Sequence, residues 1–187
     1  MTVAGDGWFD LARRVDSPNF GLRPDGETVS LVVIHNISLP PGEFGGPWIE
    51  DFFLNRLDAT AHPYFASIAS LQVSSHFLIR RDGEVVQFVS TENRAWHAGA
   101  SCWQGRDNCN DFSIGIELEG SDELPFALAQ YASLWRLLDV LCAAYPVSAI
   151  AGHSDIAPGR KTDPGPCFDW VALRQRFPGL GFPEEAA

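Results

Sequence analysis

The chain has 187 residues, the length of one domain with room for a sizeable core. Hydrophobic residues make up 45% of the sequence and charged residues 20%, which excludes a disordered chain. The formal net charge of −11 repels phosphate backbones and anionic membrane surfaces. We therefore expect no nucleic-acid partner and no membrane partner.

The N-terminal residues carry Asp6 and Asp10 where an export signal needs a basic start and an unbroken apolar stretch. No segment approaches the ~18 apolar residues of a membrane span. Both features predict a cytoplasmic protein. Because cytoplasmic thiols stay reduced, we expect free thiols at all four cysteines, namely Cys102, Cys109, Cys142 and Cys167.

The first half of the chain predicts a buried strand, a long loop, two short helices and a hairpin. Residues 31–35 are uniformly apolar and rich in β-branched side chains, as in a strand buried on both faces. The loop over 36–47 is rich in Pro and Gly, and Asp82-Gly83 is a strong hairpin signal. The helices are expected at 48–56 and 61–70, and the hairpin strands at 75–81 and 84–89.

The second half predicts two strands and two helices. Residues 113–119 alternate between aliphatic and other side chains, and residues 126–145 show the period of an amphipathic helix. A strand at 149–152, a loop at 157–166 and a helix at 168–177 follow. Because a hairpin interrupts the strand–helix alternation, we expect an α/β fold with a mixed central β-sheet flanked by helices. Residues 1–187 are expected to form a single domain, with 177–187 as a C-terminal tail.

Two histidines stand at the ends of predicted strands. His35 and His153 each precede an irregular segment, which is where open α/β sheets present reactive groups. Asp163 follows ten residues after His153 in the GRKTDPGP segment. Two imidazoles and one carboxylate are a usual hydrolytic zinc set, with a fourth position for water. A turn-forming Asp-Pro pair is the alternative interpretation of Asp163.

Two further residues are candidates for proton and charge chemistry. Glu117 lies on the non-aliphatic side of its strand, where a carboxylate could act as the base for a metal-bound water. A solvated face shared with Glu119 is the alternative. Lys161 is the only lysine among 13 basic residues and lies two residues from Asp163. An ordinary loop lysine is the alternative there.

The other histidines carry weaker signals. His97 precedes a turn of small residues that would let a ligand approach, whereas His62 and His76 lie near apolar residues and are interpreted as structural. The cysteines lack the close pair spacing of structural zinc sites. Cys167, four residues after Asp163, is the thiol closest in sequence to the expected metal ligands.

The sequence resembles the N-acetylmuramoyl-L-alanine amidases of the type-2 amidase and peptidoglycan-recognition group, and most closely their AmpD-type branch. Six motifs carry the resemblance over nearly the whole chain, and the first and last are highly specific. They are VVIHNISLPPGEFGGPWIEDFF, AHPYF, SSHFLIRRDGEVVQFV, RAWHAGAS, NDFSIGIELEG and GHSDIAPGRKTDPGPCFDW.

This resemblance implies an N-acetylmuramoyl-L-alanine amidase-like fold and a zinc-dependent enzyme. It implies zinc bound by His35, His153 and Asp163, with Glu117 and Lys161 as catalytic residues. The implied substrate is a small muropeptide recycled from the cell wall, cleaved between (1,6-anhydro-)N-acetylmuramic acid and L-alanine. We expect the chain to act as a monomer.

The substrate contacts are the part of the family pattern from which this sequence departs. Gln72 and Asn108 stand where relatives have arginines for the stem-peptide carboxylates, although Arg106 is near. Asn36, His97 and Arg106 are therefore the candidate substrate-binding residues. Two alternative functions are a non-catalytic peptidoglycan-binding module, which would require a missing metal ligand, and a phage-type amidase that acts on intact wall.

Overall fold

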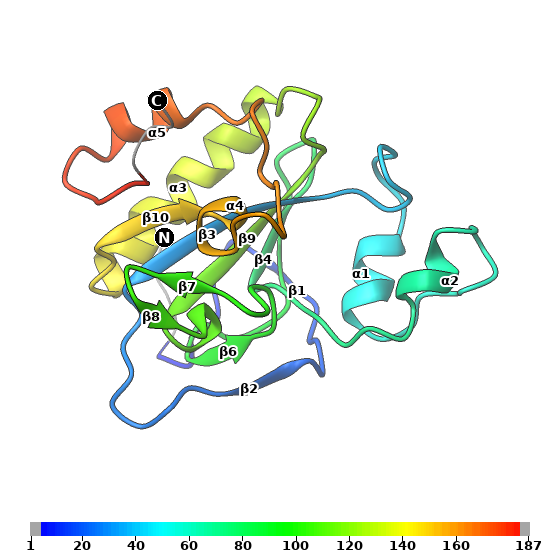
Figure 1. Cartoon of the computed structure of the whole chain (residues 1–187), viewed down its shortest axis with the longest axis horizontal. Helices are drawn as coiled ribbons and strands as arrows, with labels where there is room; N and C mark the ends of the chain where they lie inside the picture. The colour runs from blue at the N-terminus through cyan, green and yellow to red at the C-terminus, as the bar shows by residue number, and fades with distance from the viewer. Residues whose placement is uncertain (1–4, 184–187) are drawn as a thin grey trace.

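The computed structural model describes residues 5–183, and a six-stranded sheet lies at their centre (Figure 1). Strand β3 pairs in parallel with both β9 and β10, whereas β4 pairs in parallel with β9 and antiparallel with β5. The expected mixed sheet is confirmed. In order across the sheet, the strands are β1 (Arg13–Arg14), β5 (Val85–Gln87), β4 (Phe77–Ile79), β9 (Ser113–Glu119), β3 (Leu31–Ile37) and β10 (Ala149–Gly152).

The two central strands are buried on both faces. The predicted strand at 31–35 is confirmed, and β3 continues two residues further into the segment expected to be a loop. All seven residues of β9 are buried, so the solvated face considered for Glu117 and Glu119 is wrong. The physical reason is that layers cover both sides of this strand. One face packs on α3, and the other faces His97, a cavity and the loop at Gly45.

The helices are shorter than the sequence pattern predicts. Helix α1 ends at Phe53 because Asn55 adopts a positive φ of 58°, which helices do not contain. Only one turn of the expected helix at 61–70 forms, because Pro63 disfavours helical backbone before it. The helices are α1 (Trp48–Phe53), α2 (Phe65–Ile68), α3 (Leu128–Ala144), α4 (His153–Ile156) and α5 (Trp170–Arg176).

Several very short elements have no counterpart in the sequence prediction. They contain two to four residues each, too few for a hydrophobic period to show. They include β1, the one-turn helix α4, and the pairs β2 (Phe20–Leu22) with β6 (Asn93–Ala95) and β7 (Cys102–Trp103) with β8 (Arg106–Asp107), as well as the 3-10 helix η1 (Cys109–Asp111).

The hairpin prediction is confirmed at Asp82-Gly83. Gly83 adopts a φ of 90°, and its N–H donates to the carbonyl of Arg80 at 2.9 Å. Strands β4 and β5 follow as an antiparallel pair. The turn thus uses the backbone freedom of glycine, as the sequence signal requires.

The helices form layers on either side of the sheet (Figure 1). Helix α3 packs its leucines against one face, and α1 and α2 cover β4 and β5 from the other. Within the C-terminal segment, Phe177 and Phe182 pack on the core and Gly181 bridges to Ala149, while residues 184–187 of the expected tail lie outside the described part. Among residues 5–183, none of the helices is long and apolar enough to cross a membrane.

Candidate metal centre and active site

A cavity of about 390 Å³ opens at the carboxyl ends of β3 and β9. Its polar end contains most of the residues that the sequence singles out, and its other wall is apolar and aromatic. The polar residues are His35, Asn36, His97, Glu117, His153, Lys161 and Asp163, and the apolar wall includes Phe52, Phe53, Tyr64, Ile68, Leu71 and Trp96.

Three of these side chains meet at a single point. His35 Nδ1 lies 2.9 Å from His153 Nδ1 and 3.0 Å from Asp163 Oδ2, and the third side of this triangle is 3.1 Å. The sheet explains the meeting of the histidines, since Gly152 of β10 pairs with Ile34 of β3 and the next residues project at the same edge. Asp163 joins them because its carbonyl accepts the N–H of Ser154 at 2.9 Å.

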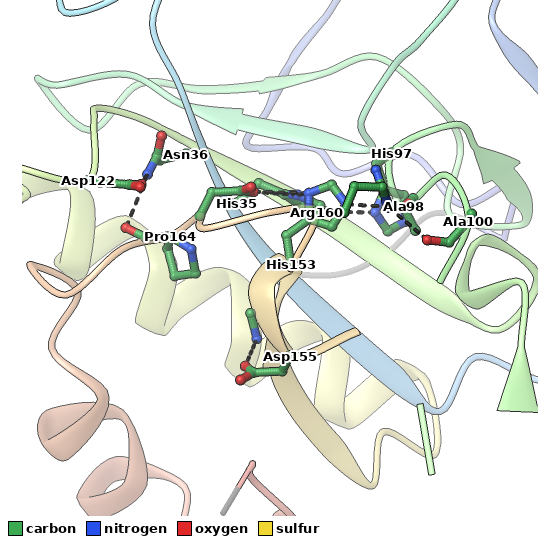
Figure 2. A network of polar contacts seen from close by, with 12 residues as sticks. His35, Asn36, His97, Ala98, Ala100, Asp122, His153, Asp155, Arg160 and Pro164 are labelled. Carbon is green, nitrogen blue, oxygen red and sulfur yellow. Dashed lines mark hydrogen bonds and ion pairs between the residues drawn. The ribbon is translucent and has the colours of Figure 1, made fainter. Parts of the chain in front are cut away.

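The chemistry of this triangle fits a divalent metal ion. His153 Nε2 lies 3.1 Å from the carbonyl of Ala98, which can only accept, so Nε2 carries the proton and Nδ1 keeps its lone pair (Figure 2). Asp163 contributes a second electron-rich atom. Each residue can offer one ligand atom, and these three atoms lie within 4.8 Å of one another. Such convergence of acceptors is stable when a cation sits between them.

Burial and hydrogen bonding shift the pKa values of His35 and Asp163. His35 and His153 are 1% and 3% exposed. Burial lowers the pKa of His35 to about 4, with a further contribution from the charge of His153 against the opposing hydrogen bond to Asp163. Burial alone would raise the pKa of Asp163, but its hydrogen bonds to the two histidines hold that pKa below its usual range. A neutral imidazole at His35 beside the Asp163 carboxylate is the form in which such residues bind a metal.

Glu117 lies next to the triangle and is 8% exposed. It pairs with His35 across β3 and β9, so both side chains leave the sheet toward the cavity. Its Oε2 atom is buried without a hydrogen-bond partner among residues 5–183. Burial, followed by the negative charge of Asp163, raises the pKa of Glu117 well above its usual range, and Lys161 partly opposes this. A carboxyl group with a raised pKa suits proton transfer near neutral pH.

Lys161 lies in the loop after α4 and lines the same cavity. Its backbone N–H donates to the carbonyl of Ala157 at 3.1 Å, which anchors the loop, while the residue itself is exposed. Its charge lowers the pKa values of Glu117 and His35. Lys161 thus brings a positive charge to the mouth of the site.

Of the three candidate substrate-binding residues, two line the cavity and one does not. Asn36 lines the cavity, and its amide donates to Asp122 Oδ1 at 2.6 Å and to the carbonyl of Pro164 at 3.1 Å (Figure 2). His97 also lines the cavity, with both ring nitrogens bonded inside the protein. Arg106 lies elsewhere, paired with Glu27 at 2.8 Å and stacked over Phe112.

Gln72, Asn108 and the four cysteines were also singled out from the sequence. Gln72 is exposed between the cavity-lining residues Leu71 and Val73, so it stands at the rim. Asn108 caps η1 in the left-handed region, with a φ of 57°. The four cysteines are free thiols, as expected, and Cys109 is buried.

Two groups of residues at the site were not predicted from the sequence. The first is the aromatic wall with Tyr64 and Trp96, whose signal was available, because both occur in the AHPYF and RAWHAGAS motifs. The second lies behind His97, where Ser113 and Asn110 bond its ring and backbone. Nothing in their spacing indicates this role, because the contacts join separate segments.

Comparison with known proteins agrees with this geometry. Residues 25–166 match the model of the N-acetylmuramoyl-L-alanine amidase family, and the chain belongs to that family. It is 60% identical over 171 residues to the 1,6-anhydro-N-acetylmuramyl-L-alanine amidase AmpD of Citrobacter freundii, a match that covers 90% of this chain and 91% of that protein.

Two solved structures extend the comparison. The crystal structure of a selenomethionine derivative of AmpD superposes with a TM-score of 0.91 at 57% identity, covering 94% of this chain and 99% of that one. The amidase AmiD of Escherichia coli, in complex with the substrate anhydro-N-acetylmuramic acid-L-Ala-D-γ-Glu-L-Lys, gives a TM-score of 0.60 at 31% identity over 87% of this chain and 63% of that one. The expected amidase-like fold is confirmed.

Proposed function

We propose that this chain is a zinc-dependent amidase that hydrolyses the bond between 1,6-anhydro-N-acetylmuramic acid and L-alanine in soluble muropeptides, as part of cell-wall recycling. The observation that carries the proposal is the meeting of His35, His153 and Asp163 at one end of a cavity that also contains Glu117 and Lys161. The high identity to AmpD proteins supports the choice of bond and substrate.

In this proposal, His35 and His153 hold zinc through Nδ1 and Asp163 holds it through a carboxylate oxygen. The set of two nitrogens and one oxygen matches hydrolytic zinc sites. When bound, zinc lowers the pKa of a coordinated water and polarises the scissile carbonyl. Side chains of the protein carry out the proton transfer and stabilise the developing charge.

Glu117 acts as the general base and then as the general acid. Its buried carboxylate takes the proton of the attacking water, for which the raised pKa gives it enough basicity. The same carboxyl group then delivers this proton to the nitrogen of L-alanine as the amide bond breaks. Because Oε2 has no other hydrogen-bond partner among the described residues, it is free to carry the proton.

Lys161 stabilises the negative charge that develops on the carbonyl oxygen. Its ammonium group is compact, and the residue lies in the loop that leads from α4 to Asp163 and lines the cavity. A positive charge held at this point interacts more strongly with the tetrahedral oxyanion than with the neutral carbonyl, which is the requirement for accelerating the reaction.

The surroundings of the site support a small, soluble substrate. The apolar wall with Tyr64 and Trp96 offers faces for a sugar ring, and Asn36, whose N–H groups bond Asp122 and Pro164, offers its side-chain oxygen at the polar end. The net charge of −11 disfavours attachment to an anionic polymer. We further propose that residues 1–187 form one zinc amidase domain that works as a monomer, because every group named comes from a single chain. We propose that this enzyme acts in the cytoplasm.

A non-catalytic binding module is the alternative, and it requires the loss of a metal ligand. The meeting of all three ligand side chains beside a buried carboxyl group argues against it. A phage-type amidase is the other alternative. The N-acetylmuramoyl-L-alanine amidase LysC of Clostridium intestinale has a TM-score of 0.66 at 16% identity, a likeness of fold alone.

The test combines metal analysis with kinetics on purified full-length protein. We expect about one zinc per chain in the wild type. His153→Ala and Asp163→Asn should lose the metal, whereas Glu117→Gln should keep it and lose turnover, by about 10²–10⁴-fold for a general base. Full zinc occupancy in both ligand variants, or normal turnover of Glu117→Gln, would contradict the assignment.

A further inference from the structure

The side chain of His97 connects the metal triangle to the interior of the protein. Its Nδ1 lies 2.9 Å from His35 Nε2, the ring nitrogen that points away from the triangle (Figure 2). Its Nε2 lies 3.1 Å from Ser113 Oγ, and that hydroxyl lies 2.5 Å from the carbonyl of Cys109. The four groups form one chain of hydrogen bonds.

The end of this chain fixes the direction of every bond in it. A carbonyl can only accept, so the Ser113 hydroxyl donates to Cys109 and accepts from His97 Nε2–H. A neutral His97 protonated on Nε2 has a lone pair on Nδ1. That lone pair accepts from His35 Nε2–H, which leaves His35 Nδ1 as a lone pair aimed at the triangle.

The tautomer of His153 is fixed in the same way by Ala98, the residue after His97. The carbonyl of Ala98 accepts its Nε2–H at 3.1 Å, so both histidines of the triangle are held in the same tautomer by consecutive residues of one segment. Asn110 anchors this segment, because its Oδ1 accepts the backbone N–H groups of His97 at 3.1 Å and Ala98 at 2.9 Å.

Gly115 of β9 leaves room for the His97 ring because it has no Cβ atom. A Cβ atom on Gly115 would lie 2.5 Å from Cγ and 2.7 Å from Nδ1 of His97. His97 is 9% exposed and Ser113 is fully buried, so water does not replace these bonds easily.

We propose that His97 and Ser113 are positioning residues that hold His35 in the tautomer protonated on Nε2 and so prepare Nδ1 for zinc. This inference rests on the proposed function, since it concerns the zinc site. It assigns His97 to the support of a metal ligand. Hydrogen-bond partners of metal-binding histidines fix ring orientation and tautomer, and their loss typically weakens metal binding by about 10–100-fold.

The first test measures zinc affinity by chelator competition in a matched pair of full-length variants. His97→Asn keeps an acceptor oxygen near the position of Nδ1, whereas His97→Leu has a similar shape and no acceptor. We expect the zinc dissociation constant of His97→Leu to rise by about 10–100-fold and that of His97→Asn to stay close to wild type. Equal affinities of His97→Leu and the wild type would overturn the proposal.

His76→Asn is the control for loss of a buried imidazole. His76 is fully buried next to His97, but its Nδ1 accepts from Gly115 N–H and its Nε2 faces the carbonyl of Asn93. This variant should lose stability and keep its zinc affinity. If it weakens zinc binding as much as His97→Leu, general destabilisation explains both results and the proposal fails.

The second test observes the tautomer directly by nitrogen-15 NMR of the zinc-loaded protein. We expect a protonated Nε2 on His35 with scalar coupling to an unprotonated Nδ1 of His97, and loss of this coupling in Ser113→Ala. A proton on His97 Nδ1 would overturn the inference. Absence of zinc from the wild type would instead contradict the proposed function, so the two failures are distinguishable.

Discussion

Lys161 is the residue whose role depends most on what the cavity binds. It is the only lysine of the chain, and it lines the cavity from the loop that leads from α4 to Asp163. If its ammonium stabilises the oxyanion, Lys161→Ala should lower kcat by roughly 10²–10³-fold with little change in KM, because the interaction forms in the transition state. Steady-state kinetics on zinc-loaded enzyme measures this.

Lys161→Arg provides the matched comparison. The planar guanidinium keeps the charge but places it differently, so rescue should be incomplete. Metal analysis of both variants should show wild-type zinc content. A zinc-loaded alanine variant with wild-type turnover would remove Lys161 from the mechanism, as expected for a solvated charge.

His76 makes stability depend on pH. Burial, and then the charge of Arg23, lowers the pKa of His76 to about 3. The unfolded chain binds this proton below about pH 6.5 and the folded chain does not, so stability present above that pH is lost as the pH falls toward the folded pKa. In this window His76 alone should reduce the free energy of unfolding by up to about 1.4 kcal/mol per pH unit.

Urea unfolding of wild type and His76→Asn at a series of pH values checks the effect. The variant is expected to be less stable at neutral pH but to show a shallower loss on acidification, by the equivalent of one proton. Since zinc release affects both proteins, the difference between them isolates His76. Identical slopes would show that His76 is not held neutral in the fold.

Most of the individual side chains at the polar end of the cavity could be predicted from the sequence. His35 and His153 stood out because strands deliver them to one sheet edge, and Asp163 because of its distance from His153 in the chain. Arg106 was proposed from proximity in sequence alone, and it lies outside the cavity against Glu27. Side-chain direction in a short two-residue strand cannot be predicted from periodicity.

Strand β9 is the element on which the site is built. Gly115 leaves space for His97, Glu117 enters the cavity, and Glu119 accepts from Gly45 N–H at 2.6 Å and from Arg80 at 3.1 Å. In the proposed function, the same face of one strand therefore supports a metal ligand, supplies the general base and anchors the loop after β3. This explains why polar side chains occur on a strand that is buried throughout.

Gly115→Ala tests this element. Because the added Cβ would meet the His97 ring at 2.5 Å, we expect a loss of about 1–3 kcal/mol in the free energy of unfolding and weaker zinc binding. Gly179→Ala is the matched control, since a Cβ there meets nothing within 4 Å. Denaturant titration and chelator competition give the two readouts. If the Gly115→Ala protein is destabilised but binds zinc with wild-type affinity, packing at this position of β9 does not affect the metal site, and the expectation is wrong.

The long or strongly patterned elements were predictable and the short ones were not. The strand at Ser113–Glu119 and the strand at Ala149–Gly152 match their predicted bounds, and α3 falls within two residues of its own. The burial of Glu119 could not be predicted, because it depends on Arg80 and Gly45 from other segments. Alternation describes one strand, whereas burial depends on the layers that cover it.

On the scale of the whole molecule, charge and topology favour a small substrate. The net charge of −11 opposes attachment to an anionic wall, and the cavity lies between the sheet edge and the α1–α2 side of the protein. The proposed zinc ligands come from β3, from the start of α4 and from the following loop, so β3 and β10 must pair before the three side chains can meet. Metal binding should therefore stabilise the entire fold.

Incubating the purified chain with a soluble 1,6-anhydro-N-acetylmuramyl tripeptide, with and without a zinc chelator, and identifying the products by mass spectrometry tests the proposed zinc amidase activity. We expect release of the free tripeptide with L-alanine at its amino terminus. The chelator should abolish this release and zinc should restore it, and it should be much faster than release from intact sacculi. No cleavage of the tripeptide substrate, cleavage that persists without zinc, or equal rates on both substrates would contradict the proposed activity.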